Sequence, residues 1–186
     1  DSNGQPYVVD AKNQRIQVFS VTVTEEGGGG TDPPQEADNC TLICMADTDC
    51  KPDTNTLVAR ALKVEATPQG FLVAGDIQYG SNASCIFSAF GALDKIAMVA
   101  MGNHDDFNKY SGHYKLSKSY YSRVIQNIGI IAMDSESSFS VGSAQHTFVV
   151  NELQKFHDSA TVDWIIVMIH RPFYSGTGGS THPMNE

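Results

Sequence analysis

The stretch IAMVAMGNHD occupies residues 96–105. Its first six residues are apolar, and a glycine, an asparagine, a histidine and an aspartate follow directly. A short apolar run that ends in turn-forming residues predicts a buried strand. The polar residues would then lie at the carboxyl end of that strand, which is where open α/β sheets place their binding sites.

Three other apolar runs end in the same way. The predicted strands at residues 41–46, 71–74 and 162–169 lead into ADTD at 46–49, GDIQY at 75–79 and IHRP at 169–172. Parallel strands bring their carboxyl ends to one edge of a sheet. The four strand ends would therefore present Asp47, then Asp76 with Tyr79, then Asn103 with its neighbour His104, and finally His170.

The apolar runs alternate with segments of helical periodicity, which we predict at residues 54–66, 85–93, 115–125 and 145–157. Residues 128–133 predict a further strand, and residues 138–141 another that is shorter. Strands alternating with helices are typical of βαβ units and of a largely parallel sheet covered by helices. The predicted fold class is α/β.

The first part of the chain has a different pattern. Residues 1–26 are rich in β-branched and aromatic residues, and they predict a β segment or the tail of an upstream β domain. Residues 27–38 begin with four consecutive glycines and include two prolines, a composition typical of a linker. Residues 39–186 carry the alternating pattern and form one predicted domain.

Composition excludes several classes of protein. The chain has 186 residues and a formal net charge of −9. This balance argues against a nucleic-acid-binding or anionic-membrane-binding surface, since both need a basic face. No apolar run reaches the roughly 18 residues that a membrane-spanning helix needs. The sequence leaves self-association open.

The cysteines at positions 40, 44, 50 and 85 permit two disulfides in three connectivities, between which sequence alone does not choose. Cys50 with Cys85 is the favoured pair, because both would lie in loops at the same end of the sheet. Cys40 and Cys44 lie four residues apart in one predicted strand, about 13 Å, which is too far for a direct bond. The sequence therefore also allows Cys40 and Cys44 to be free thiols.

Three features together favour an oxidising, secreted or extracellular location. The cysteine count is even, and two glycosylation acceptor triplets begin at Asn39 and Asn82. The chain also starts at Asp1 and not at methionine, so we expect that an upstream segment was removed or left out.

Oxygen and nitrogen donors of the kind found at the four strand ends suit iron, zinc or manganese. Asp76 could bridge two ions, and the phenolate of Tyr79 would favour a trivalent one. Taken singly, each residue also has an ordinary structural explanation, such as a helix N-cap for Asp47 or Asp76. Their joint occurrence at four strand ends favours a metal site that binds phosphate.

At these residues the sequence resembles the calcineurin-like metallophosphoesterases, and most closely the purple acid phosphatases. That group carries the ordered motifs GDxG, GDxxY, GNH(D/E), VxxH and GHxH. The second, third and fourth match at residues 75–79, 102–105 and 167–170, whereas ADTD at 46–49 keeps only the aspartate of the first. Asp134 also falls where relatives often have a strand-end aspartate. The tyrosine of GDxxY separates purple acid phosphatases from the wider superfamily.

The resemblance implies a layered fold of β-sheets flanked by helices, incomplete at the C-terminus of this chain. It also implies hydrolysis of phosphomonoesters by two metal ions, Fe with Fe, Zn or Mn, with a metal-activated water as nucleophile. The implied metal ligands are Asp47, Asp76, Tyr79, Asn103 and His170.

Two histidines would be catalytic. By the resemblance, His104 contacts the phosphate or protonates the leaving group, which is a general acid's task. His182 falls about where relatives place a substrate-binding histidine, although a histidine in a surface loop is the equal alternative. The substrate would be a small phosphate ester.

The fifth motif, GHxH, does not occur in the chain. Its histidines would supply one ligand to each ion. Either the chain is part of a longer enzyme, or it is an extracellular structural, adhesive or filament protein built on a phosphatase-like scaffold. The intact middle motifs favour the enzyme, and the altered first motif favours the alternative.

Overall fold

The computed structural model describes residues 7–8, 17–21, 40–50, 52–64, 67–80 and 82–172. Its strands form two four-stranded sheets. The first sheet has the order β2 (Gln17–Val21), β3 (Cys40–Met45), β4 (Gly70–Ala74) and β5 (Ala97–Ala100). The last three run parallel, and β2 pairs antiparallel with β3 at the edge.

The second sheet has the order β1 (Tyr7–Val8), β8 (Trp164–Met168), β7 (Ile128–Ala132) and β6 (Tyr121–Ile125). Strands β1, β8 and β7 are parallel, and β6 forms an antiparallel hairpin with β7. The sequence pattern predicts one largely parallel sheet, but the strands divide between two. In each sheet, a core of parallel strands carries one antiparallel strand.

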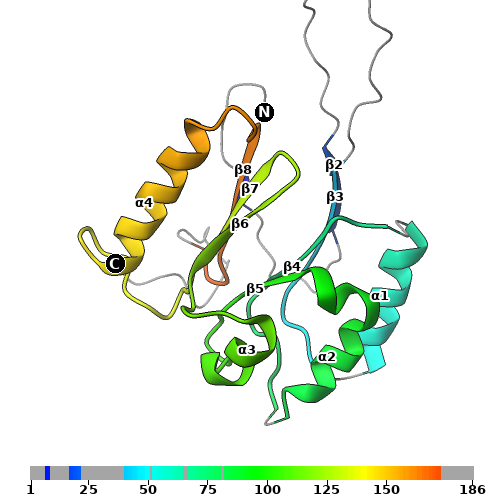
Figure 1. The fold of residues 1–186 in the computed structure, drawn as a ribbon. Coiled ribbons are helices and arrows are strands. Elements are labelled where there is room, and N and C mark those ends of the chain that lie inside the picture. The colour runs from blue at the N-terminus through cyan, green and yellow to red at the C-terminus, as the bar shows by residue number, and fades with distance from the viewer. Residues whose placement is uncertain are drawn as a thin grey trace, which may run out of the picture.

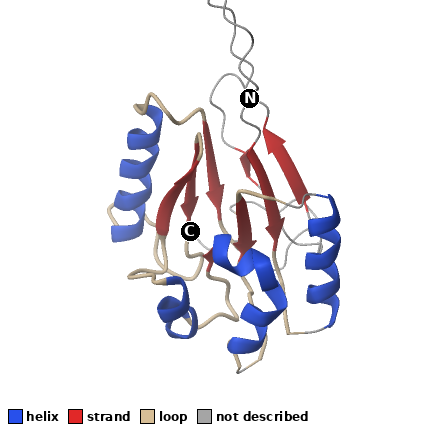
Figure 2. Ribbon diagram, turned by 45° about the vertical axis from the view of Figure 1, so that its right-hand side comes forward, coloured by secondary structure: helices blue, strands red, loops and turns tan. Residues whose placement is uncertain are grey.

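The helices lie outside the two sheets (Figures 1 and 2). Helices α1 (Pro52–Val64), α2 (Ser84–Phe90) and α3 (Phe107–Tyr114), together with the 3₁₀ helix η1 (Gly91–Ile96), pack on the first sheet. Helix α4 (Ala144–His157) covers the second. This order of layers confirms an α/β fold of sheets flanked by helices.

Alternation along each strand builds the core. In β3, Ile43 points to the helices of its own sheet, whereas Leu42 points to the second sheet. In β7, Ile130 meets the first sheet and Ile131 meets Phe156 of α4. Strands β3 and β7 are therefore buried on both faces, which explains why they are almost entirely apolar.

The two sheets are also joined at one edge. The Tyr121 hydroxyl of β6 accepts a hydrogen bond from the Val99 N–H at 2.8 Å and donates one to the Val99 carbonyl at 3.0 Å. Val99 belongs to β5, the last strand of the first sheet. The side chain therefore satisfies backbone groups that an edge strand leaves unpaired.

The helix predicted at residues 115–125 is wrong. Helix α3 ends with Lys115 as its C-cap at φ 55°, and β6 follows at Tyr121. A two-residue turn at 126–127, with Gln126 at φ 52°, joins β6 to β7. Pairing with β7 decides the structure here, because Val124 and Ile125 suit a strand better than a helix.

The strand predicted at residues 138–141 is also wrong. This segment forms turns that lead to the Ser143 N-cap of α4, and Val141 is 90% exposed. Helix α3 was not predicted. Its signal is Asp106, an N-cap whose carboxylate accepts from the Asn108 N–H.

The N-terminal segment contributes a strand to each sheet, since β1 pairs with β8 and β2 pairs with β3. The predicted division into residues 1–26, 27–38 and 39–186 stays a prediction, and residues 27–38 lie outside the described residues. Among the helices that the structure describes, none has both the length and the apolar character needed to cross a membrane.

Candidate metal centre

The polar residues that follow the strands lie at one edge of the sheets, as the topology requires. Asp47, Asp76 and Asn103 follow β3, β4 and β5 of the first sheet, and His170 follows β8 of the second. Ala46, Ala74 and Ala100 are buried between the sheets just before the polar residues. These small side chains keep the two sheets close at this edge.

Three side chains form a group with metal-ligand spacing. One ligand atom each of Asp47, Asp76 and His170 lies within 4.8 Å of the others. Asp76 is buried, at 3% exposure, while Asp47 and His170 are half-buried. Two carboxylates and an imidazole are a donor set that first-row ions bind. The structure thus brings three of the five predicted ligands together with metal-ligand spacing.

The orientation of His170 suits a metal ligand. Its Nδ1 lies 3.0 Å from the Ala74 carbonyl, which can only accept, so Nδ1 carries a hydrogen. Its Nε2 then faces Asp76 Oδ1 at 3.4 Å. In a neutral imidazole both of these facing atoms carry lone pairs, so a cation between them is favoured. A backbone carbonyl that fixes the second ring nitrogen is typical of metal-bound histidines.

The charges of the two residues are coupled. Burial alone would lower the pKa of His170, but its hydrogen bonds with Asp76 and the Ala74 carbonyl raise it. Burial alone would raise the pKa of Asp76, but the bonds from His170 and from the His104 N–H lower it. The pair therefore favours an anionic carboxylate beside a positive charge, which a proton on His170 or a metal ion can supply.

Tyr79 is connected to the ligand group by a hydrogen bond to Asp47. Its hydroxyl donates to Asp47 Oδ1 at 2.9 Å, and the side chain is 46% exposed. Burial and the bond to Asp47 raise the pKa of this phenol well above its usual value. Ionisation to a phenolate ligand therefore requires a cation close by.

His104 lies at the exposed rim of the group. Its backbone N–H donates to Asp76 Oδ1 at 3.0 Å, and its side chain is 52% exposed. Its Nε2 is 4.0 Å from Asp76 Oδ2, and its ring lies 4.7 Å from the Tyr79 ring. Asn103 is exposed next to it. His182 lies outside the described residues.

Both aspartates of the ligand group have an unusual backbone conformation. Asp47 has φ 52° and Asp76 has φ 46°, both in the left-handed region. This conformation costs a non-glycine residue about 1–2 kcal/mol, and such strain is commonly found at functional sites. The N-cap explanation fails for Asp76, because α2 begins at Ser84 with Ala83 as its N-cap. Asp47 likewise lies five residues before α1 begins at Pro52.

Two side chains that sequence reasoning did not single out lie behind the group. The Asp105 carboxylate accepts from the Ile77 and Gly102 N–H groups, each at 2.9 Å. The buried Thr48 hydroxyl donates to the Ile77 carbonyl at 2.6 Å. Burial raises the pKa of Asp105 to about 6, although the two N–H groups act to lower it. In the sequence, Asp105 is recognisable only as the last residue of GNHD at 102–105.

Asp134, the aspartate after β7, has a different task. Its carboxylate accepts from the Glu136 N–H and from the Ser137 hydroxyl. Its backbone exchanges hydrogen bonds with the buried Gln145 side chain. Asp134 therefore orders the turn between β7 and α4.

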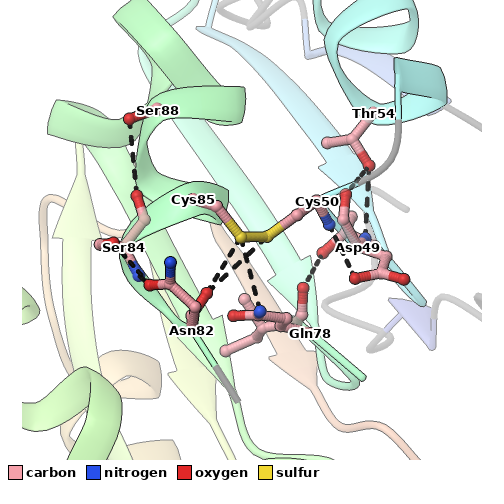
Figure 3. The surroundings of a disulfide bond; sticks show 10 residues. Asp49, Cys50, Thr54, Gln78, Asn82, Ser84, Cys85 and Ser88 are labelled. Carbon is pink, nitrogen blue, oxygen red and sulfur yellow. Dashed lines mark hydrogen bonds between the residues drawn. A yellow bond between two sulfur atoms is a disulfide. The ribbon is translucent and has the colours of Figure 1, made fainter. Parts of the chain in front are cut away.

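A disulfide joins the loop after β3, which carries Asp47, to helix α2, which follows the loop that carries Asp76 and Tyr79 (Figure 3). Cys50, after β3, is bonded to Cys85 of α2, with Cα atoms 5.6 Å apart and a sequence separation of 35. This is the predicted pair. Cys40 and Cys44 are buried free thiols in β3. Gln78, beside Tyr79, donates from Nε2 to Cys85 Sγ at 3.5 Å.

The double variant Cys50→Ala, Cys85→Ala is expected to lower the free energy of unfolding by about 3–4 kcal/mol, because the unfolded chain regains the entropy of a loop of this length. Urea unfolding measures the loss. The unaltered protein treated with a dithiol should lose a similar amount. An unchanged midpoint after verified reduction would contradict the expectation.

Known proteins match this chain over much of its length. A model of the calcineurin-like phosphoesterase family matches residues 40–185. "Probable purple acid phosphatase 20" of Arabidopsis thaliana is 26% identical over 129 residues, covering 56% of this chain and 30% of that protein. "Purple acid phosphatase 18" of the same organism is 25% identical over 138 residues, covering 62% and 31%.

The chain thus spans less than a third of the length of these two relatives. Among solved structures, Yfce, a phosphoesterase from E. coli, is 13% identical with a TM-score of 0.37, covering 50% of this chain and 56% of that one. The family match extends over most of the described residues and includes the three-residue ligand group. The chain belongs to the calcineurin-like phosphoesterase family.

Proposed function

We propose that the protein hydrolyses phosphomonoesters with a dinuclear metal centre, as an acid-phosphatase-like enzyme. The observation that carries this proposal is the group formed by Asp47, Asp76 and His170, whose ligand atoms lie within 4.8 Å of one another. The likeness to two purple acid phosphatases supports the choice of reaction.

In this proposal Asp76 holds both ions, because its two carboxylate oxygens can each take one. Asp47 and Tyr79 hold the first ion, and their contact at 2.9 Å supports a shared site. Asn103 and His170 hold the second. A phenolate is a hard, anionic ligand, so we propose a trivalent iron in the first site, paired with Fe, Zn or Mn.

When bound, such a pair of ions activates a water as nucleophile and stabilises the charge of an in-line displacement. Residues of the chain would bind the substrate and donate a proton to the leaving oxygen. The exposed His104 ring lies at the rim and suits a donor to the leaving oxygen. We assign His182 to substrate binding on the resemblance alone.

We also propose that the protein works in an oxidising compartment, as a secreted or extracellular enzyme. The Cys50–Cys85 disulfide supports this location. The acceptor Asn82 is exposed, as N-glycosylation at that position requires. Mass spectrometry of the protein from its natural source would detect a glycan there.

A paired assay tests the proposed reaction. The protein from its natural source should hydrolyse p-nitrophenyl phosphate faster than bis(p-nitrophenyl) phosphate. Removal of metal with a chelator should abolish both activities, and added Fe, Zn or Mn should restore them. Preference for the diester would contradict the monoester assignment. Absence of hydrolysis in metal-loaded protein would instead favour the structural or adhesive alternative.

A further inference from the structure

Both backbone polar groups of Ile77, its N–H and its carbonyl, are held by side chains at the strand end that carries Asp76. Thr48 Oγ1, from the loop after β3, donates to the Ile77 carbonyl at 2.6 Å. Asp105 Oδ1, from the loop after β5, accepts from the Ile77 N–H at 2.9 Å. The Ile77 side chain is fully buried among the helices of the first sheet. The residue directly after Asp76 is therefore fixed at three points.

Asp105 makes a second connection of the same kind. Its other oxygen accepts from the Gly102 N–H at 2.9 Å, so each carboxylate oxygen holds a different strand end. The Asp47 N–H donates to the Gly75 carbonyl at 3.1 Å, which joins the β3 and β4 ends directly. Thr48, Ile77 and Asp105 thus set the relative positions of three loops that carry candidate ligands.

We propose that Thr48 and Asp105 are positioning residues for the metal centre, which fix the Asp76 carboxylate by holding the two peptide groups that flank Ile77: Asp105 accepts from the Ile77 N–H, and Thr48 donates to the Ile77 carbonyl. This inference rests on the proposed metal centre. Neither side chain belongs to the ligand group of Asp47, Asp76 and His170.

The backbone of Asp76 explains why such support is needed. At φ 46° the residue is in the left-handed region, a conformation that costs a non-glycine residue free energy and persists where the surroundings hold it. A change in the backbone angles of Asp76 would move its Oδ1 away from the His104 N–H, now at 3.0 Å, and from His170 Nε2, at 3.4 Å. Metal ligands must be held within about 0.5 Å of their working positions.

Two nearly isosteric variants remove one support each. Asp105→Asn keeps the shape but can offer only one oxygen, so its amide group faces an N–H that the carboxylate now accepts from. Thr48→Val keeps the shape and removes the hydroxyl. Asp106→Asn is the matched control for the first, because Asp106 caps α3 and asparagine is an equally good cap. Thr48→Ser is the control for the second, since it restores the donor.

Titration of each metal-free chain with Mn²⁺, followed by the EPR signal of the free ion, measures affinity without an activity assay. Asp105→Asn and Thr48→Val should each weaken Mn²⁺ binding by about 10–100-fold, the usual effect of losing a group that orients a ligand. Asp106→Asn and Thr48→Ser should stay close to the unaltered chain. Thermal unfolding of the metal-free variants confirms that each is folded at the titration temperature.

The outcomes separate this inference from the proposed function. If the unaltered chain binds Mn²⁺ and the folded Thr48→Val variant binds it equally well, the positioning role is wrong and the metal centre stands. Equal weakening by Asp106→Asn and Asp105→Asn would also overturn the inference, because charge and not position would then be the cause. An unaltered chain that does not bind Mn²⁺ would overturn both proposals.

Discussion

Asp76→Ala is expected to remove both metal ions and all hydrolysis. Asp76 is the buried carboxylate of the ligand group, and it is the residue that we assign to both ions. Its Oδ1 also accepts from the His104 N–H, so the variant frees the loop that carries the candidate acid. The loss should therefore exceed that of any other single ligand.

Differential scanning fluorimetry with and without metal measures the effect independently of activity. A metal at 100 times its dissociation constant stabilises a folded protein by about 2.7 kcal/mol, and Asp76→Ala should lose that shift. Asp53→Ala is the control, because Asp53 is an exposed aspartate in the first turn of α1. If Asp76→Ala kept both the metal-dependent shift and full activity, the ligand assignment would be wrong.

Gly102→Ala is expected to have the second largest effect. A Cβ at this position would lie 2.5 Å from the Asp76 backbone nitrogen, in contact with Asp76 Oδ1, and 2.9 Å from His170 Cδ2. The backbone of Asp76 cannot give way without moving the end of β4. We therefore expect a loss of stability of about 1–3 kcal/mol from overpacking, together with metal affinity reduced at least tenfold.

Gly112→Ala is the matched control. Gly112 lies in α3, and a Cβ there would meet nothing within 4 Å. The same substitution should stabilise the protein by about 0.5–1 kcal/mol, because alanine is the better helix former. If the space around the candidate ligands is as tight as described, urea unfolding shows opposite signs for the two variants, and metal titration shows weaker binding for Gly102→Ala alone. Equal behaviour would contradict that geometry.

Much of the fold could be predicted because most of its strands are buried on both faces. The apolar runs at residues 41–46, 71–74, 96–101 and 128–133 correspond to β3, β4, β5 and β7. Their two-sided burial gives a continuous signal, and glycine or aspartate ends it sharply. The division into two sheets could not be predicted, because periodicity does not report which strands pair.

The segment after α3 shows where local pattern fails. Residues 121–125 are exposed or half-buried, since β6 is an edge strand covered less than the others. An edge strand has a weak apolar signal, and its structure depends on pairing with β7 and on the Tyr121 bonds to Val99. The Tyr121 bonds span 22 residues of sequence, and the β7 partners lie beyond the turn at 126–127, so neither contact shows in the apolar periodicity of residues 115–125.

The positions of three candidate ligands could be predicted from the sequence, but the residues that hold the neighbouring backbone could not. Strand-end position and residue type suffice to nominate Asp47, Asp76 and His170, which the structure brings together. The roles of Thr48 and Asp105 depend on hydrogen bonds to the Ile77 backbone, across 29 and 28 residues of sequence. A hydrogen bond to a backbone group does not depend on the residue type of its partner, so the pattern of side chains does not reveal it.

The central claim is that these strand ends hold a dinuclear metal centre. The most direct test is the metal content of the protein purified from its natural source without chelators, measured per chain by elemental analysis. We predict about two transition-metal ions per chain, with iron as one of them. A protein that carries no transition metal, and that takes up none when it is offered, would contradict the account.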